Sequence, residues 1–157
     1  MAQDNSNPEV LIILGSKSDQ EYLERAEKIL VDFEIPFESH FCSAHRQHDK
    51  LAKIIKKAES ENVAVIIAGA GLAAHLPGVI ASLTLIPVIG VPIPAGTLGG
   101  LDALLSIVQM PAGIPVATVG MGRMDNAALL AAQIIATSGN ENLKQKLREY
   151  RNKWKTD

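Results

Sequence analysis

Short apolar runs alternate with segments of helical periodicity along this chain, and this alternation constrains its fold more than any other feature. The predicted strands are residues 10–14, 37–41, 63–68, 87–91 and 116–120, most of them apolar, as in parallel strands covered on both faces. Between and after them, apolar side chains recur at helical spacing, which predicts helices at 18–33, 48–60, 78–83, 101–108, 126–136 and 142–154. In the first helix, Ser18 and Glu21 fit a capping box.

Strands that alternate with helices in this way predict an α/β fold, a three-layer αβα sandwich around a parallel sheet with strand order 2-1-3-4-5. Aromatic residues make up only 4% of the chain and hydrophobic residues 47%, so the core must consist mainly of Ala, Val, Ile and Leu. No repeat or linker divides the sequence. We expect one domain, 1–157, with a flexible N-terminus at 1–8 and an extra C-terminal helix within 141–157.

Charge and cysteine content argue against several classes of partner. A formal net charge of −2 provides no basic field to hold a nucleic acid. Cys42 is the only cysteine and the histidines form no compact ligand set, so neither a disulfide nor a bound metal is expected. The apolar runs are too short to span a membrane, and residues 1–8 lack the apolar stretch of a signal segment. We therefore expect a cytoplasmic protein.

The predicted sheet order also locates a site. In such sheets, ligands bind beyond the carboxyl ends of the strands, near the switch point between the first and third strands. Segments 15–19, 43–46 and 69–76 follow the strands that meet there, and they are rich in Gly, Ser and His. The functional site is expected where these three segments converge.

The first of these segments, Gly-Ser-Lys-Ser-Asp, is suited to an anion. Ser16, Ser18 and unpaired backbone N–H groups at a helix N-terminus attract negative charge, and the Asp19 carboxylate is suited to ribose hydroxyls. The alternative is that Ser18 and Asp19 only cap the helix. The segment is not a Walker loop, because the long glycine spacing before a Lys-Ser/Thr pair is missing.

The second segment, Ser43-Ala44-His45-Arg46, contains the candidate catalytic group. A histidine can both donate and accept a proton near neutral pH, and Arg46 provides a planar donor for phosphate or carboxylate. Cys42 would also allow a Cys–His nucleophile. Its position at the end of a strand favours a small buried thiol instead.

The third segment fits a G-x-G-x-x-A pattern, a weak indication of dinucleotide binding. That function is disfavoured because residues 86–100 contain no acidic side chain for a ribose hydroxyl, and because Pro77 interrupts the expected helix. Small residues here would let the backbone close over a small ligand, with His75 as a second polar group.

Five motifs together carry a resemblance to a known family. They are Gly15-Ser16-Lys17-Ser18-Asp19, Ser43-Ala44-His45-Arg46, Ala68-Gly69-Ala70-Gly71, Ala73-Ala74-His75-Leu76-Pro77-Gly78 and Ser106-Ile107-Val108-Gln109-Met110-Pro111. In this order and spacing, over about 10–136, they resemble the class I N5-carboxyaminoimidazole ribonucleotide mutases of de novo purine (IMP) biosynthesis. The resemblance implies a flavodoxin-like fold, a single catalytic domain and a homo-octamer with active sites at subunit interfaces. It also implies an isomerase that needs no cofactor or metal.

The family's reaction assigns roles to these positions. A carboxyl group leaves the exocyclic nitrogen of the imidazole ribonucleotide as carbon dioxide, which is recaptured by ring carbon four inside a closed pocket. The resemblance implies that His45 is the general acid/base, that Asp19 binds the ribose and that Arg46 with the serines holds the 5′-phosphate. The implied substrate-binding residues are Ser16, Ser18, Asp19, Ser43, Ala44, Arg46, Gly71, His75 and Leu76. Leu72 stands where the family frequently has glycine, and Gln47-His48 where Thr-Pro is common.

Two other functions remain open at this stage. The related aminoimidazole ribonucleotide carboxylases use free carbon dioxide on a similar fold. A non-enzymatic flavodoxin-like module would bind flavin or act as a receiver. However, Gly15-Ser16 and Gly69-Ala70 replace a receiver's acidic residues, and the loops lack aromatic partners for a flavin. The nearly uncharged stretch 92–105 is expected at subunit contacts.

Overall fold

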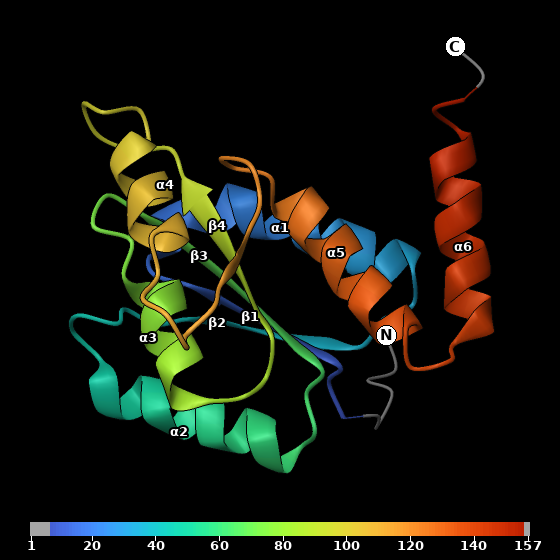
Figure 1. The fold of residues 1–157 in the computed structure, drawn as a ribbon, viewed down its shortest axis with the longest axis horizontal. Helices are drawn as coiled ribbons and strands as arrows, with labels where there is room; N and C mark the ends of the chain where they lie inside the picture. The colour runs from blue at the N-terminus through green and yellow to red at the C-terminus, as the bar shows by residue number, and fades with distance from the viewer. Residues whose placement is uncertain (1–6, 156–157) are drawn as a thin grey trace.

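The computed structural model describes residues 7–155 and contains a parallel sheet between two helical layers (Figure 1). Its strands are β1 (Val10–Leu14), β2 (Phe37–Phe41), β3 (Val65–Gly71), β4 (Val88–Ile93) and β5 (Ala117–Thr118). The order β2-β1-β3-β4-β5, parallel throughout, confirms the predicted fold class. The helices are α1 (Gln20–Asp32), α2 (His48–Ser60), α3 (Leu76–Leu83), α4 (Leu101–Val108), α5 (Met124–Ala136) and α6 (Glu141–Asn152). Residues 1–6 of the segment predicted to be flexible lie outside the described residues.

Side chains that alternate along β1 divide the core into two halves. Ile12 and Leu14 pack with α1, α5 and α6, whereas Leu11 and Ile13 pack with α2, α3 and α4. All of β1 is buried, and burying a side chain of this size contributes about 1.5–3 kcal/mol. The central strand is therefore held from both faces, which keeps the carboxyl ends of its neighbours in fixed positions.

The additional C-terminal helix, α6, stands at one side of the molecule beside α5 (Figure 1). Asn140 caps it by accepting a hydrogen bond from the backbone N–H of Leu143 at 3.0 Å. Its buried leucines are Leu143 and Leu147, and the ring of Tyr150 lies 5.6 Å from that of Phe33. This helix is thus attached to the core along one narrow face.

The third strand differs most from its prediction. Strand β3 covers Val65–Gly71, so Gly69 and Gly71 belong to the strand and the loop is limited to residues 72–75. Gly69 is needed for packing, because a Cβ there would lie 2.4 Å from Cδ2 of Leu14. Glycine in this segment therefore marks close approach between strands, not a turn.

Two helix starts were also predicted two residues too late. Pro77 does not interrupt α3, which begins at Leu76, because the missing N–H of a proline in the first turn would have no helical partner in any case. Helix α5 begins at Met124, two residues before its predicted start, and α6 ends at Asn152, before its predicted end. Strand β5 is shorter than predicted, with Ala117 and Thr118 paired to Ile89 and Gly90.

No helix of the described residues is long and apolar enough to cross a membrane.

Gly90 provides a test of how tightly α4 packs on the sheet. A Cβ at Gly90 would lie 2.4 Å from Cγ2 of Ile107 and 2.9 Å from Cγ1 of Val116. We expect Gly90→Ala to lower the free energy of unfolding by about 1–3 kcal/mol, the usual cost of overpacking. Urea unfolding measures this, with Gly15→Ala as the control, because a Cβ there meets nothing closer than 3.9 Å. Equal stability of the two variants would contradict the packing described.

Candidate functional site

The three predicted segments converge on one cavity at the carboxyl ends of β1, β2 and β3. Its volume is about 500 Å³. Every candidate site residue from the sequence lines it, namely Ser16, Ser18, Asp19, Ser43, Ala44, His45, Arg46, Gly71, His75 and Leu76. The remaining lining residues are Gly15, Ala70, Leu72, Ala73 and Ala95. Hydroxyl, carboxylate, imidazole and guanidinium groups thus share one small space.

The first segment does not form the predicted capping box. A short 3₁₀ turn, Lys17–Asp19, precedes α1, and Ser16 caps this turn by accepting from the backbone N–H of Ser18 at 3.3 Å. Asp19, at the N-cap position of α1, makes no side-chain capping bond. The turn moves the helix start past Ser18, so the interpretation that Ser18 and Asp19 only cap the helix is wrong.

Ser16, Ser18 and Asp19 are instead connected to one another. The Ser18 hydroxyl lies 2.9 Å from the Ser16 hydroxyl and 3.0 Å from a carboxylate oxygen of Asp19. Partial burial raises the pKa of Asp19 above its ordinary value, and the hydrogen bond from Ser18 opposes this effect. The two hydroxyl groups and the carboxylate thus form a row of hydrogen-bonding oxygen atoms on one side of the cavity.

In the second segment, Arg46 makes one long hydrogen bond and no ion pair, so its guanidinium group is available to a ligand. Its Nε donates to the Ser43 hydroxyl over 3.4 Å, and no carboxylate of residues 7–155 forms an ion pair with it. The Ser43 backbone N–H donates to the Gln47 side chain at 3.1 Å, which fixes the turn. An anion entering the cavity therefore meets an uncompensated guanidinium.

Cys42 does not act as a nucleophile in this arrangement. It follows β2, with only 1% of its surface exposed, and its thiol points to the Gln47 carbonyl oxygen at 3.8 Å. Burial raises the pKa of the Cys42 thiol, which disfavours the reactive thiolate. The prediction of a small buried thiol is confirmed.

A second cavity, of about 610 Å³, adjoins the first. Gly15, Ser16, Ser43 and Arg46 line both spaces. Lys17 and Lys50 line only the second, where Lys50 donates to the Phe41 carbonyl oxygen at 3.2 Å. These two lysines were not among the predicted site residues, although each lies within or close to a predicted segment. The second cavity is therefore the more cationic of the two, and neither His45 nor His75 lines it.

The shortest hydrogen bond between side chains in the site joins two histidines from different loops. Nε2 of His45 lies 2.8 Å from Nδ1 of His75, with the rings nearly perpendicular at 82°. A hydrogen bond at this distance requires one of the two nitrogens to carry a proton and the other to accept it. The sequence analysis gave His75 as a polar group of the site and, by resemblance, as a substrate-binding residue. The structure pairs it directly with the proposed acid/base.

Ala95 is the lining residue that the sequence analysis missed most clearly. It follows β4, and the rule that ligands bind beyond the carboxyl ends of strands would have included its loop. Segment 106–110, from the fifth family motif, does not line the cavity within a single chain; the family resemblance implies that it packs near a site from the subunit interface. Met110 instead packs over Gly78, where a Cβ would lie 2.9 Å from its sulfur.

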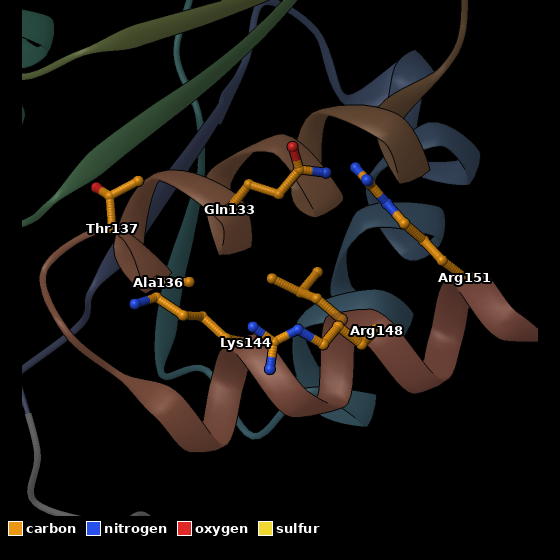
Figure 2. Close-up of a pocket in the computed structure, with 7 residues that line it drawn as sticks. Gln133, Ala136, Thr137, Lys144, Arg148 and Arg151 are labelled. Carbon is orange, nitrogen blue, oxygen red and sulfur yellow. The ribbon is translucent and has the colours of Figure 1, made fainter.

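A separate groove lies between α5 and α6, with a volume of about 280 Å³ (Figure 2). Lys144, Arg148 and Arg151 line it from α6, opposite Gln133 of α5 and Thr137, which follows that helix. It contains cations but no group that exchanges protons near neutral pH, and Lys144 already pairs with Glu141 at 2.6 Å. Within residues 7–155, no group of three or more His, Cys, Asp or Glu side chains is placed to hold a metal ion.

Comparison with known proteins gives consistent matches. The profile of the family described as AIR carboxylase matches residues 9–157. The N5-carboxyaminoimidazole ribonucleotide mutase of Pyrococcus abyssi is 56% identical over 92% of this chain and 82% of its own length. The enzyme of the same name from Escherichia coli is 49% identical over 96% of this chain and 90% of its own. A crystal structure of Treponema denticola PurE superposes with a TM-score of 0.85 at 28% identity, covering 93% of this chain and 90% of that one.

Asp19 gives this site a measurable pH signature. Because burial raises the pKa of Asp19, ionisation of this side chain destabilises the folded state. The destabilisation is absent at pH values below the ordinary pKa of an aspartate and complete at pH values above the raised pKa. Asp19→Asn should therefore raise the urea midpoint at pH 7, and the gain should disappear below about pH 3.9. Asp49→Asn, at an exposed position outside the cavity, should show no such gain. A variant less stable than the parent at pH 7 would mean that the Ser18 bond outweighs burial.

Proposed function

The chain belongs to the AIR carboxylase family, and we propose that it is an N5-carboxyaminoimidazole ribonucleotide mutase that acts through carbon dioxide confined beside His45. Such an enzyme is an isomerase: it moves a carboxyl group from the exocyclic nitrogen of the imidazole to ring carbon four. The observation that carries the proposal is the 2.8 Å contact of His45 with His75 at a cavity that also holds Asp19 and Arg46.

The reaction needs one proton to be delivered and another to be removed. When the carboxyl group leaves nitrogen, the electron pair of the broken bond stays on nitrogen and accepts a proton. When ring carbon four binds carbon dioxide, it loses a proton. A histidine can perform both transfers, and His45, hydrogen-bonded to His75, is the group placed for them. His75 holds the imidazole of His45 in position and fixes which of its nitrogens faces the substrate.

The remainder of the cavity fits a ribonucleotide. Asp19 supplies acceptors for ribose hydroxyls, and Ser16, Ser43 and Arg46 lie where the two cavities join. The 5′-phosphate is proposed to lie on the side of Arg46 that faces Lys17 and Lys50, because a dianion is stabilised by several uncompensated cations. This leaves the imidazole beside His45 and the small residues Ala70, Gly71 and Ala73.

Backbone atoms and small side chains near His45 support confinement of carbon dioxide. Proton transfer by a positioned side chain contributes about 10²–10⁴-fold, so holding the released molecule against ring carbon must supply much of the remaining rate. No cofactor or metal is needed in this scheme, because both bond changes are driven by the substrate's own electron pairs. The charged, phosphorylated substrate does not cross membranes, so the proposed location is the cytoplasm.

The competing function within the family is carboxylation of aminoimidazole ribonucleotide by free carbon dioxide. The family's description names that activity, whereas the relatives from Pyrococcus abyssi and Escherichia coli are named mutases. The two differ in whether carbon dioxide is generated inside the cavity or enters from solution.

Activity on two substrates separates these functions. We expect the purified protein to convert N5-carboxyaminoimidazole ribonucleotide to the 4-carboxy product at low bicarbonate. His45→Asn should lower the rate by about 10²–10⁴-fold, because it removes the proton transfer and keeps a polar, uncharged side chain at that position. Formation of the product is followed by its absorbance or by mass.

The controls for this assay are a second substrate and a second histidine. Product formed only from aminoimidazole ribonucleotide with bicarbonate would assign the carboxylase function instead. His40→Asn changes a histidine that pairs with Glu38 at 2.9 Å, outside the cavity, and should retain activity. No product from either substrate would refute both functions.

Assembly into a homo-oligomer is part of the same proposal, and an octamer is expected from the family resemblance. Of the apolar stretch 92–105, Ile93 and Ala103 are buried in the chain's own core. Leu98, Leu101 and Leu105 remain 62%, 48% and 46% exposed. A patch of this kind on one side of a molecule supports contact with a second copy.

Sedimentation velocity tests the assembly. The parent protein should sediment as a large oligomer, and Leu105→Glu should shift it to smaller species, because a buried charge at a subunit contact is strongly unfavourable. Val31→Glu changes an equally apolar residue, 64% exposed on α1, and should leave the size unchanged. A monomeric parent protein would refute the interface.

A further inference from the structure

Leu72 has an unusual backbone conformation at the edge of the cavity. It directly follows β3 with φ at +54°, in the left-handed region that glycine adopts readily and leucine rarely does. Its side chain lines the cavity and is 52% exposed. A large apolar residue in a strained, exposed position at a functional site calls for a functional explanation.

The Leu72 side chain bridges the loops that follow β3 and β4. Its Cδ2 lies 2.7 Å from the point that a Cβ on Gly96 would occupy, so the leucine rests directly on the Gly96 backbone. The strand ends that lead into these loops are also close, because a Cβ on Gly71 of β3 would meet the carbonyl oxygen of Ile93 of β4 at 3.1 Å and Cβ of Ala95 at 3.3 Å. Leu72 therefore closes the side of the cavity between β3 and β4.

This wall matters because carbon dioxide has no charge for the site to hold. The Asp19 carboxylate and the Arg46 guanidinium bind polar parts of a nucleotide, but a small neutral molecule is retained by walls and dispersion contacts. Leu72 and Leu76 are the large apolar residues of the lining, and Leu76 is only 2% exposed. Of these two leucines, only Leu72 has a largely exposed side chain, so it is the one that can cover the side of the cavity open to solvent.

We propose that Leu72 determines whether released carbon dioxide is recaptured or escapes. This inference rests on the proposed mutase function. After the nitrogen–carbon bond breaks, nitrogen keeps the electron pair and takes a proton from His45. In recapture, ring carbon four bonds to carbon dioxide and its proton returns to His45. In escape, aminoimidazole ribonucleotide and carbon dioxide leave, and His45 regains its proton from water.

Isotope retention measures the two fates. The substrate is N5-carboxyaminoimidazole ribonucleotide labelled with ¹³C in its carboxyl group, in the presence of excess unlabelled bicarbonate. The readouts are the ¹³C content of the 4-carboxy product and the amount of aminoimidazole ribonucleotide released, each corrected for the reaction without enzyme. Three variants are compared with the parent protein: Leu72→Gly, Leu72→Asn and Leu85→Gly.

The variants separate the side chain from the backbone. Glycine and asparagine both accept a positive φ, so neither change strains the loop, but each removes the apolar wall. Leu85 is 101% exposed and lies outside the cavity, which makes it the matched control. Thermal unfolding of each variant checks that the fold is retained.

We expect the parent protein and Leu85→Gly to transfer most of the ¹³C. In both Leu72 variants the ratio of transferred to released carboxyl groups should fall by about tenfold, the lower end of what an apolar contact contributes in a pocket. An unchanged ratio in folded Leu72→Gly and Leu72→Asn would overturn the inference and leave the mutase function intact. A parent protein that forms no labelled product would overturn both.

Discussion

The parallel pairing of β1 with β3 is the interaction on which the rest of this structure depends. The chain forms β2 on one side of β1 and β3 on the other. The segments that follow β1 and β3 therefore run in opposite directions from the carboxyl ends of these two strands, which leaves space for a ligand between them. Both strands are buried on both faces, and Gly69 lets Leu14 pack against β3 without a gap. The loops that carry Asp19, His45 and His75 therefore start from adjacent, immobile points. Short loops on a rigid base explain how two exposed histidines can meet at 2.8 Å.

The features that sequence predicts well are those set by burial. The bounds of β1, β2, α2 and α4 follow from apolar runs and periodicity, and the parallel sheet follows from alternation; the order 2-1-3-4-5 is one of the orders that alternation allows. The errors occur where a residue type has two physical meanings. Gly69 and Gly71 resemble turn residues but permit close packing inside β3, and Pro77 resembles a helix breaker but occupies a first turn. The His45–His75 contact and the conformation of Leu72 depend on tertiary geometry, which periodicity does not contain.

Charge and chemistry are distributed unevenly through the site. Lys17, Lys50 and Arg46 lie toward one end, and the imidazoles lie toward the small residues after β3. A ligand with a dianionic end and a neutral heterocycle matches this gradient in one orientation only, because reversing it would place the phosphate among alanines and glycines. The proposed chemistry thus requires few dedicated contacts to the ring. Orientation is provided by the part of the molecule that does not react.

The narrow attachment of α6 has a consequence for local stability. This helix is held by Leu143 and Leu147, by the Tyr150–Phe33 contact and by an ion pair of Lys146 with the exposed Glu34 at 2.6 Å. Most of the rest of its surface carries charged or polar side chains. A segment with so few buried contacts can detach at a smaller free-energy cost than the unfolding of the whole domain. Its amide hydrogens should accordingly exchange with solvent while those of β1 and β3 remain protected. We therefore expect the C-terminal helix to open as a separate cooperative unit, while the sheet and its loops stay folded.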